Sequence, residues 1–506
     1  MKKIIKFIFS RITIAAILIA LQLILIIFII NRAYDMFKWF QLAMFLLEIL
    51  IILDISKRDI PADLKIPWLA VVILLPIVGV IIYVIFSKNR ARKKHVKYFK
   101  NILSSSQEII QDYKIDYNHF DKYEDCINYI TNTSGCIGFE NTSTEYFDSG
   151  ESFYKTYLED LKSATSFIFM EYFIISKGLM FETVLDILKE KVKNGVEVRI
   201  MYDDIGSMGK LPSNFSKKMK EYGIICVKFN PFTPIISAIH NNRDHRKITV
   251  IDGKIGYVGG INFADEYINV VKRFGYWKDS TVKICGEATL QLTVMFLQNF
   301  NLQNKTVEDF TKYTNIKFEK INTSGYVVPF CDGPTPIYVD LIGENTYINL
   351  INHATTSIKI ATPYLLLDTQ LKNALSTASK RGVRVQIFTP HIPDKKYVFA
   401  LTRSNYFDLL KNGIEIFEFQ PGFLHNKNLI VDDEIAIVGT INLDYRSMIH
   451  HYECGIVLYK TSSINKIIED FDNIIKYSIH IDPNKFKLRW DEKLISSLLN
   501  IFQPLL

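Results

Sequence analysis

The pattern His-x-Lys-x4-Asp occurs twice in this chain, first at residues 245–252 and again at 425–432. Each copy continues in the same register to a Gly and an Asn. The recurring residues are His245, Lys247, Asp252, Gly259 and Asn262 in the first copy, and His425, Lys427, Asp432, Gly439 and Asn442 in the second. A lone His-x-Lys is usually a core histidine beside a solvated lysine, but a five-point pattern that occurs twice is not accidental. The repeat therefore predicts a duplicated fold.

An apolar run follows the lysine in each copy, at residues 248–251 and 429–431. Both runs are rich in β-branched residues and close at the motif aspartate, which predicts a buried strand that ends in a turn. His and Lys two positions apart on a strand point to the same face. Each motif therefore offers an imidazole and an ammonium group side by side. Asp252 and Asp432 complete the motif, and their place at the strand end favours a role in holding the turn and the domain interface.

Two facing motifs would make one pocket with two histidines, two lysines and two asparagines. Such a pocket suits a phosphodiester: Lys and Asn neutralise the phosphoryl oxygens, one His attacks phosphorus, and the other protonates the leaving alkoxide. The sequence contains no His, Cys and Asp cluster with metal-ligand spacing. We therefore expect no metal and no cofactor.

The composition fits an intracellular protein with an anionic partner. The 506 residues carry a net charge of +7, which suits either nucleic acid or an acidic membrane surface. Six scattered cysteines form no Cys-x-x-Cys pair, so we expect reduced thiols rather than a disulfide framework or a zinc site.

Three apolar segments precede the motifs. Residues 12–30 can span a bilayer and lack a following cleavage site, so we expect a retained anchor rather than a signal peptide. Residues 66–86 are expected to form a full span. Residues 39–53 are shorter and contain Glu48, which predicts a tilted span, a re-entrant piece or an interfacial helix.

A basic cluster follows the third segment at Lys88, Arg90, Arg92, Lys93, Lys94 and Lys97. Such a cluster is expected on the cytoplasmic side and can bind anionic headgroups, or it can simply be solvated. The basic N-terminus favours the same side, although three full spans cannot place both ends there. We expect the larger downstream cluster to determine the orientation in the membrane. The sequence therefore predicts a multi-pass cell-membrane protein with a cytoplasmic catalytic part.

The repeat extends beyond the motifs. Residues 164–168 match 354–358, and 194–200 match 381–387. The order strand, helix, strand, strand and catalytic strand in both halves predicts a duplicated α/β domain with a largely parallel core sheet. The expected domains are a membrane anchor at 1–100, a linker at 101–144, and two homologous domains at 145–325 and 326–506. The first half has an insertion at 232–241, a candidate lid or substrate loop.

The double His-x-Lys-x4-Asp resembles the phospholipase D superfamily, and within it the chain is similar to bacterial cardiolipin synthases over essentially its whole length. The shared stretches include Arg243 to Lys247, Gly275 to Asp279, Thr362 to Tyr364, and Asn442 to Ser447. The chain departs from the family pattern at Asn426, where Ala is usual, at Thr440, where Ser is usual, and at Cys331-Asp332, where a Ser is common.

This resemblance implies two phospholipase D-type α/β sandwich domains that share one active site. It also implies transfer of a phosphatidyl group between two phosphatidylglycerol molecules through a phosphohistidine, with His245 as nucleophile and His425 as general acid. An acidic residue some thirty positions beyond each His, Asp279 and Glu453 here, would orient its imidazole. The implied partners are phosphatidylglycerol and anionic membrane lipids, with no nucleic acid, and the oligomeric state stays open. The alternatives are a phospholipase D that uses water, a nuclease, and a catalytically idle membrane scaffold.

Overall fold

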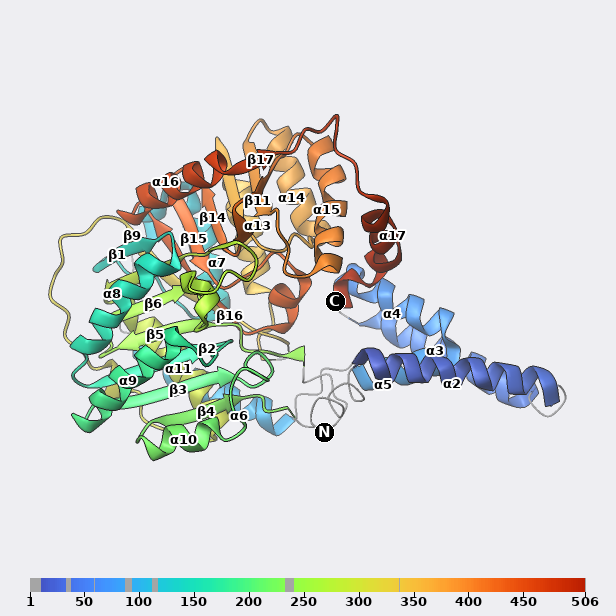
Figure 1. The fold of residues 1–506 in the computed structure, drawn as a ribbon, viewed down its shortest axis with the longest axis horizontal. Helices are drawn as coiled ribbons and strands as arrows, with labels where there is room; N and C mark the ends of the chain where they lie inside the picture. Colours follow the sequence, from blue (N-terminus) through green and yellow to red (C-terminus); the bar gives the residue numbers. More distant parts are fainter. Residues whose placement is uncertain are drawn as a thin grey trace. The chain divides into compact units, whose positions relative to one another are not determined.

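The computed structural model describes residues 11–32, 38–58, 60–86, 93–111, 117–232, 241–335 and 337–505 (Figure 1). The chain divides into two compact units. The first contains the described helices up to residue 86 and the C-terminal residues from Ser497 onward. The second contains residues 93–231 and 242–496. Both motifs lie in the second unit.

The described residues of the first unit form helices α2 (Arg11–Arg32), α3 (Lys38–Lys57), α4 (Ala62–Leu74) and α5 (Pro76–Phe86). Of the described helices, α3 is long and apolar enough to cross a membrane, and residues 17–28 and 76–86 form shorter apolar helices. The middle segment, expected to be shorter than the other two, therefore forms a helix that is long enough to cross a membrane.

The expectation of one continuous span at residues 66–86 is wrong, because the helix breaks at Leu75 and restarts at Pro76. Proline cannot donate the backbone hydrogen bond that a continuous helix needs, but it suits the first position of a new one. A Cβ on Gly79 would lie 2.2 Å from the carbonyl oxygen of Val71, so α5 folds back tightly against α4. Helices of 13 and 11 residues are about 20 and 16 Å long, which is less than the bilayer core of roughly 30 Å.

The second unit contains two large mixed sheets. The first sheet has the order β1-β8-β6-β5-β2-β3-β4. Its strands are β1 (Thr142–Phe147), β2 (Phe167–Tyr172), β3 (Glu197–Asp203), β4 (Ile225–Phe229), β5 (Lys247–Ile251), β6 (Ile255–Gly259) and β8 (Thr281–Gly286). The helices of this half are α8 (Gly150–Ser163), α9 (Leu179–Lys193), α10 (Phe215–Glu221), η3 (Asp265–Ile268), α11 (Thr289–Asn304) and α12 (Thr311–Thr314).

The second sheet repeats this plan, with the order β17-β12-β11-β10-β14-β15-β16-β9. Its strands are β9 (Tyr326–Asp332), β10 (Ser357–Ala361), β11 (Arg384–Pro390), β12 (Glu415–Phe419), β14 (Asn428–Val431), β15 (Ile435–Gly439), β16 (Glu453–Tyr459) and β17 (Ser478–His480). The helices are α13 (Ile342–His353), α14 (Thr369–Lys380), α15 (Lys396–Lys411), η4 (Arg446–His450) and α16 (Ser463–Lys476).

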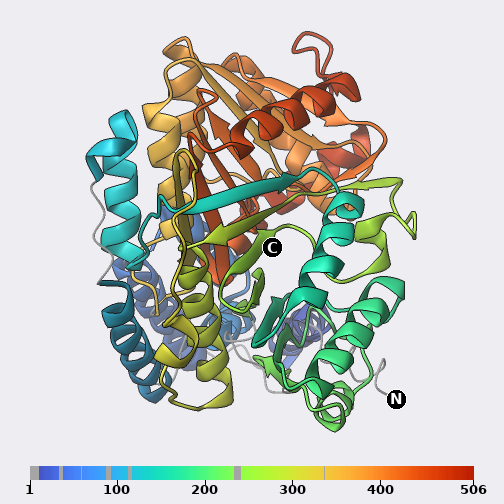
Figure 2. The same cartoon turned by 90° about the vertical axis from the view of Figure 1, so that its left-hand side faces the viewer.

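The prediction of two homologous α/β domains is confirmed, but the prediction of largely parallel sheets is wrong. Strands β2, β3 and β4 pair in parallel, as do β10, β11 and β12, while the other neighbouring strands of both sheets pair antiparallel. Helices cover both faces of the first sheet (Figure 2). Ile168 of β2 packs in the core with α8 and α9, while its neighbour Phe169 packs on the opposite face and stacks on Phe296 of α11.

The segment 101–144 is more than a linker. It contains the end of α6 (Lys93–Gln111), the turn η1 (Tyr117–Tyr123) and α7 (Glu124–Ser134). Cys126, Ile127 and Ile130 of α7 are buried in the core of the second half. At the other end of the chain, α17 (Trp490–Leu499) leads into η5 (Asn500–Leu505), and η5 packs against α4 of the first unit.

Candidate active site

Each motif histidine is fixed by the backbone of the opposite half. The amide of His245 donates to the carbonyl of Tyr452 at 2.9 Å, and the amide of His425 donates to the carbonyl of Lys278 at 2.7 Å. The second contact continues a short parallel pair between β7 (Tyr276–Lys278) and β13 (Gly422–Leu424). The two motifs therefore enter one site from two sides, although they lie 180 residues apart in the sequence.

The carboxylates that contact the imidazoles also come from the opposite halves. Nδ1 of His245 lies 2.9 and 3.0 Å from the carboxylate oxygens of Glu453, and Nδ1 of His425 lies 2.6 Å from Oδ2 of Asp279. The expectation that each acidic residue orients the histidine of its own motif is therefore corrected: the pairs are crossed. Because both bonds use Nδ1, Nε2 of each ring is the atom that can attack or carry a proton.

The motif lysines lie beside their own histidines. The ammonium group of Lys247 donates to the carbonyl of His245, and that of Lys427 donates to the carbonyl of His425. All four side chains are buried, with at most 7% of any residue exposed. The site therefore brings two ammonium groups and two imidazoles together in a region that water barely reaches.

This burial sets the protonation of the site. Burial, with Lys247 nearby, lowers the pKa of His245 to about 3, and burial with Lys427 nearby lowers that of His425 to about 4. Burial also lowers the pKa of Lys247 to about 8, although Glu453 and Asp279 oppose this, and lowers that of Lys427 to about 7. Burial raises the pKa of Glu453, but His245 and His451 outweigh it, so the net pKa is below the usual value. These shifts favour neutral imidazoles beside an ionised Glu453 carboxylate.

The two motif asparagines differ in their contacts. Asn262 donates to the hydroxyl of Tyr267 at 2.7 Å and accepts from the amide of Ile174 at 2.9 Å. Asn442 is 5% exposed, and its buried Oδ1 has no hydrogen-bond partner among the described residues. Asn442 is therefore the asparagine whose amide is not already engaged in holding the fold.

Equivalent positions beside the two carboxylates are also different. Thr440 donates its hydroxyl to Oε2 of Glu453, whereas its counterpart Gly260 lies so close to Asp279 that a Cβ would be 2.1 Å from Oδ1. Thr440, a departure from the family's usual Ser, thus keeps the hydroxyl in contact with the carboxylate. A side chain at 260 would displace the Asp279 carboxylate that contacts His425, so glycine is favoured there.

Asp252 and Asp432 do not reach the imidazoles. Each follows the far end of its strand and holds a backbone turn with positive φ, 52° at both positions. Asp252 accepts from the amides of Thr165, Ser166 and Phe167, and Asp432 accepts from those of Thr355, Thr356 and Ser357. Both aspartates thus hold the turns at the ends of their strands, which is the role that their place in the sequence favours.

Comparisons with known proteins place this site in a family. The family model described as "Cardiolipin synthase, PLD-like domain" matches residues 157–273 and 347–475, and the model "Phospholipase D-nuclease N-terminal" matches residues 46–88. The chain is 41% identical over 450 residues to an uncharacterized protein of Streptococcus mutans, covering 87% of this chain and 96% of that protein. It is 33% identical over 449 residues to cardiolipin synthase 2 of Bacillus anthracis, covering 87% of this chain and 86% of that protein.

The chain belongs to the cardiolipin synthase family. The solved structure of phosphatidylserine synthase from Haemophilus influenzae has the same fold, with a TM-score of 0.57. The two sequences are 15% identical, and the match covers 76% of this chain and 97% of that one. This likeness supports the phospholipase D-type architecture alone.

Sequence reasoning missed several residues that contact the imidazoles in this cardiolipin synthase family member. The ring centroids of Tyr267 and Trp277 lie 5.6 and 5.2 Å from that of His425, and the ring of Phe173 lies 5.0 Å from that of His245. Trp277 is 7% exposed, so the same ring is also part of the buried core. Tyr267 and Trp277 follow Asp252 by 15 and 25 residues and Phe173 precedes His245 by 72, so no shared spacing in the sequence marks these residues.

His451 is a further residue that the motif pattern did not reveal. Its Nδ1 lies 3.6 Å from Oε1 of Glu453, so one carboxylate lies between two imidazoles. Ligand atoms of His245, His451 and Glu453 all lie within 4.8 Å of one another, a spacing that could hold a metal ion. The expectation of no metal rested on sequence spacing alone and did not anticipate this cluster.

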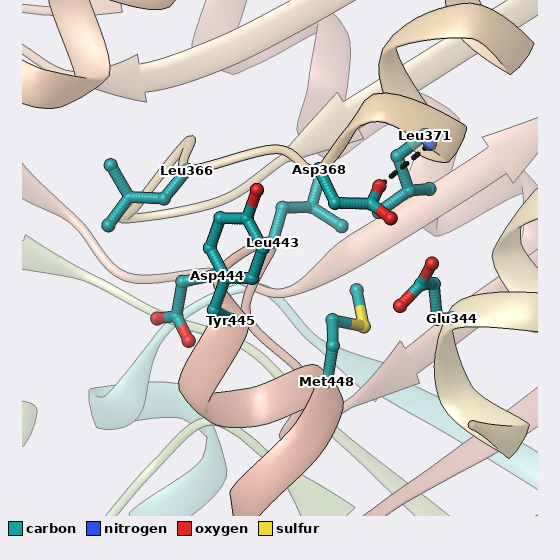
Figure 3. Close-up of a pocket in the computed structure, with 8 residues that line it drawn as sticks. All are labelled: Glu344, Leu366, Asp368, Leu371, Leu443, Asp444, Tyr445 and Met448. Carbon is teal, nitrogen blue, oxygen red and sulfur yellow. Dashed lines mark hydrogen bonds between the residues drawn. The ribbon is translucent and has the colours of Figure 1, made fainter. Parts of the chain in front are cut away.

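The second half also contains a small cavity (Figure 3). It is lined by Glu344, Leu366, Asp368, Leu371, Leu443, Asp444, Tyr445 and Met448. Its volume of about 10 Å³ has room for roughly one water molecule, which is too small for a lipid headgroup. The insertion at 232–241, the candidate lid, lies mostly outside the described residues.

Proposed function

We propose that this chain is a phosphatidyltransferase that joins two phosphatidylglycerol molecules into cardiolipin and releases glycerol. The observation that carries the proposal is the pair of buried imidazoles, each held at Nδ1 by a carboxylate of the other half and accompanied by a lysine. Membership of the cardiolipin synthase family supports the choice of substrate.

In the first step, Nε2 of His245 attacks phosphorus of phosphatidylglycerol. A P–N bond forms, the P–O bond to glycerol breaks, and His425 gives its proton to the leaving alkoxide. In the second step, the hydroxyl of another phosphatidylglycerol loses its proton to His425 and attacks phosphorus. The new P–O bond forms as the P–N bond breaks, so His245 is regenerated.

The charges of the site fit these steps. A neutral His245 has the lone pair that attack needs, and Lys247 and Lys427 can neutralise the phosphoryl oxygens. A bound phosphodiester anion would raise the pKa of His425 from about 4, because an opposite charge stabilises the imidazolium. Substrate binding would thereby prepare His425 to act as an acid.

The proposed location is the cell membrane, with the catalytic unit on the cytoplasmic side. If α2 and α3 cross the bilayer and the α4–α5 hairpin does not, the basic N-terminus and the basic cluster at 88–97 lie on the same side. This arrangement removes the conflict that three full spans would create.

A hydrolase of the same superfamily would share the covalent intermediate and pass the phosphatidyl group to water. The reaction product therefore distinguishes the transferase from the hydrolase. The purified full-length protein in phosphatidylglycerol liposomes is expected to yield cardiolipin and free glycerol in near-equal amounts. Added glycerol should drive the reaction backwards, because one phosphodiester is exchanged for another. Phosphatidic acid as the dominant product would instead identify a phospholipase D, and cleavage of DNA but not lipid would identify a nuclease.

A further inference from the structure

One loop of the first half connects two side chains that line the candidate site. It leaves Tyr267 and returns at Trp277, and the rings of both residues lie within 5.6 Å of the His425 ring. The side chain of Asn269 closes the base of the loop, since it accepts from the amide of Trp277 at 2.7 Å and donates to its carbonyl at 3.0 Å. The loop is therefore held in place at the site.

The tip of this loop carries two adjacent apolar residues that face solvent. Val270 is 53% exposed and Val271 is 49% exposed, and the exposed cations Lys272 and Arg273 follow. Nη1 of Arg273 forms a long ion pair with Oε1 of Glu266, at 3.9 Å, and the Arg273 side chain is 58% exposed. We call residues 270–273 the valine-basic tip.

A second exposed apolar residue belongs to the same surface. Leu179, at the start of α9, is 56% exposed. Asp265 ties it to the tip, because its carboxylate accepts from the amide of Leu179 at 3.1 Å while its carbonyl accepts from the amide of Val270 at 3.1 Å. Lys177, two residues before Leu179, is exposed as well. Asp265 thus links two exposed segments that each carry apolar and cationic side chains.

We propose that the valine-basic tip docks on an anionic lipid bilayer. Valines would enter the boundary between headgroups and acyl chains, while Lys272, Arg273 and Lys177 would contact lipid phosphates, a combination that suits an anionic interface. Because both stems of the loop touch His425, docking would place the entrance of the site at the membrane surface, where the lipid substrate lies. The proposal deepens the proposed function, and its role in catalysis rests on that function, but bilayer contact can be measured without any activity.

The direct test places an environment-sensitive fluorophore at Val271→Cys in the full-length protein, reconstituted in vesicles of phosphatidylglycerol and phosphatidylcholine. The matched control is Val307→Cys, since Val307 is 77% exposed on the loop after α11. Labelled wild-type protein gives the background from native cysteines. The probe at 271 should shift to the blue and be quenched by brominated lipids, while the probe at 307 should be quenched by aqueous iodide instead.

Charge reversal tests the electrostatic part. Lys272→Glu with Arg273→Glu in the Val271→Cys background should weaken lipid quenching, by about fivefold in apparent partitioning per basic residue lost. Two results would overturn the proposal: quenching by iodide equal to that of the 307 probe, or protection from both quenchers, which would indicate a protein partner or a second copy of the chain.

An activity measurement separates this proposal from the proposed function. Val270→Asp with Val271→Asp should lower cardiolipin formation in vesicles several-fold more than formation from monomeric short-chain phosphatidylglycerol, whereas Val307→Asp should leave both rates unchanged. Equal losses on both substrates would contradict a docking role. If the wild-type protein makes no cardiolipin at all, the proposed function fails while the fluorescence result still stands.

Discussion

Glu453, on the last large strand of the second half, lies 2.9 Å from Nδ1 of His245 in the first half, and Asp279 of the first half forms the reciprocal contact with His425. A carboxylate in this position holds the imidazole in one tautomer and stabilises its positive charge. The crossed pairing therefore assigns Glu453 to the step that His245 performs.

Glu453→Gln and Asp279→Asn are expected to fail at different steps. Each should lower kcat by roughly 10²- to 10⁴-fold, because the amide cannot support the same tautomer and charge. Glu453→Gln should slow formation of the covalent adduct even with an activated leaving group, such as p-nitrophenol. Asp279→Asn should recover most of its rate with that leaving group, which needs no proton. Single-turnover kinetics with both substrates would check this, and the reverse pattern would show that each carboxylate serves its own motif.

The covalent intermediate should form on His245. His425→Ala should accumulate a phosphatidyl adduct from a substrate with an activated leaving group, whereas His245→Ala should form none. Mass spectrometry locates the residue that carries the adduct, and release of the phosphatidyl group in acid identifies the bond as a phosphohistidine. An adduct on residue 425 would exchange the two roles.

The fall in activity at alkaline pH should reflect deprotonation of the two motif lysines. The pKa of Lys427 is lowered to about 7 and that of Lys247 to about 8, so these groups lose their positive charge as pH rises through this range. Since binding of the phosphodiester needs that charge, kcat/KM should fall between about pH 7 and 8.5. Lys427→Arg should move this fall to higher pH at a reduced rate, because arginine stays charged. The exposed Lys254→Arg is the control that should leave the profile unchanged.

Chelation tests whether the cluster of His245, His451 and Glu453 needs an ion. The proposed chemistry uses charge and imidazole alone, so activity should survive EDTA. Added Zn²⁺ should inhibit by occupying the three ligands, and His451→Asn should weaken that inhibition by at least about tenfold. Loss of activity on chelation that one divalent ion restores would contradict this mechanism.

Topology can be measured in intact cells. A cysteine introduced at exposed Val307 should be protected from an impermeant maleimide until the membrane is opened, as expected for a cytoplasmic catalytic unit. Native Cys454 is unsuitable for this purpose because it is fully buried. Labelling of residue 307 in unbroken cells would refute the proposed orientation.

The sequence predicted the residues of the site better than their pairing. The duplicated spacing was enough to find both histidines and both lysines, whereas the carboxylates of Asp279 and Glu453 were indicated by the family resemblance. It could not predict that Glu453 contacts His245, since Asp279 and Glu453 each lie about thirty residues beyond one histidine. That choice depends on backbone contacts between the halves, at Tyr452 and Lys278.

Strand direction and helix breaks were similarly hidden. Apolar runs identify buried strands but do not encode their direction, so the antiparallel entry of β5 beside β2 went unpredicted. Mean apolarity over 66–86 suggested one span, although Pro76 was a visible signal for the break between α4 and α5. His451 resembled any lone histidine until the fold placed it next to Glu453.

The crossed pairs have the geometry of an isologous contact, in which residue i of one copy meets residue j of the other and the reverse also holds. Two identical subunits around a two-fold axis would be forced to keep both pockets the same. Joining the copies in one chain removes that constraint, and the difference is already visible where Gly260 faces Asp279 and Thr440 faces Glu453. In the proposed mechanism, this broken symmetry would let one imidazole specialise in attack and the other in proton transfer, which two identical pockets could not do.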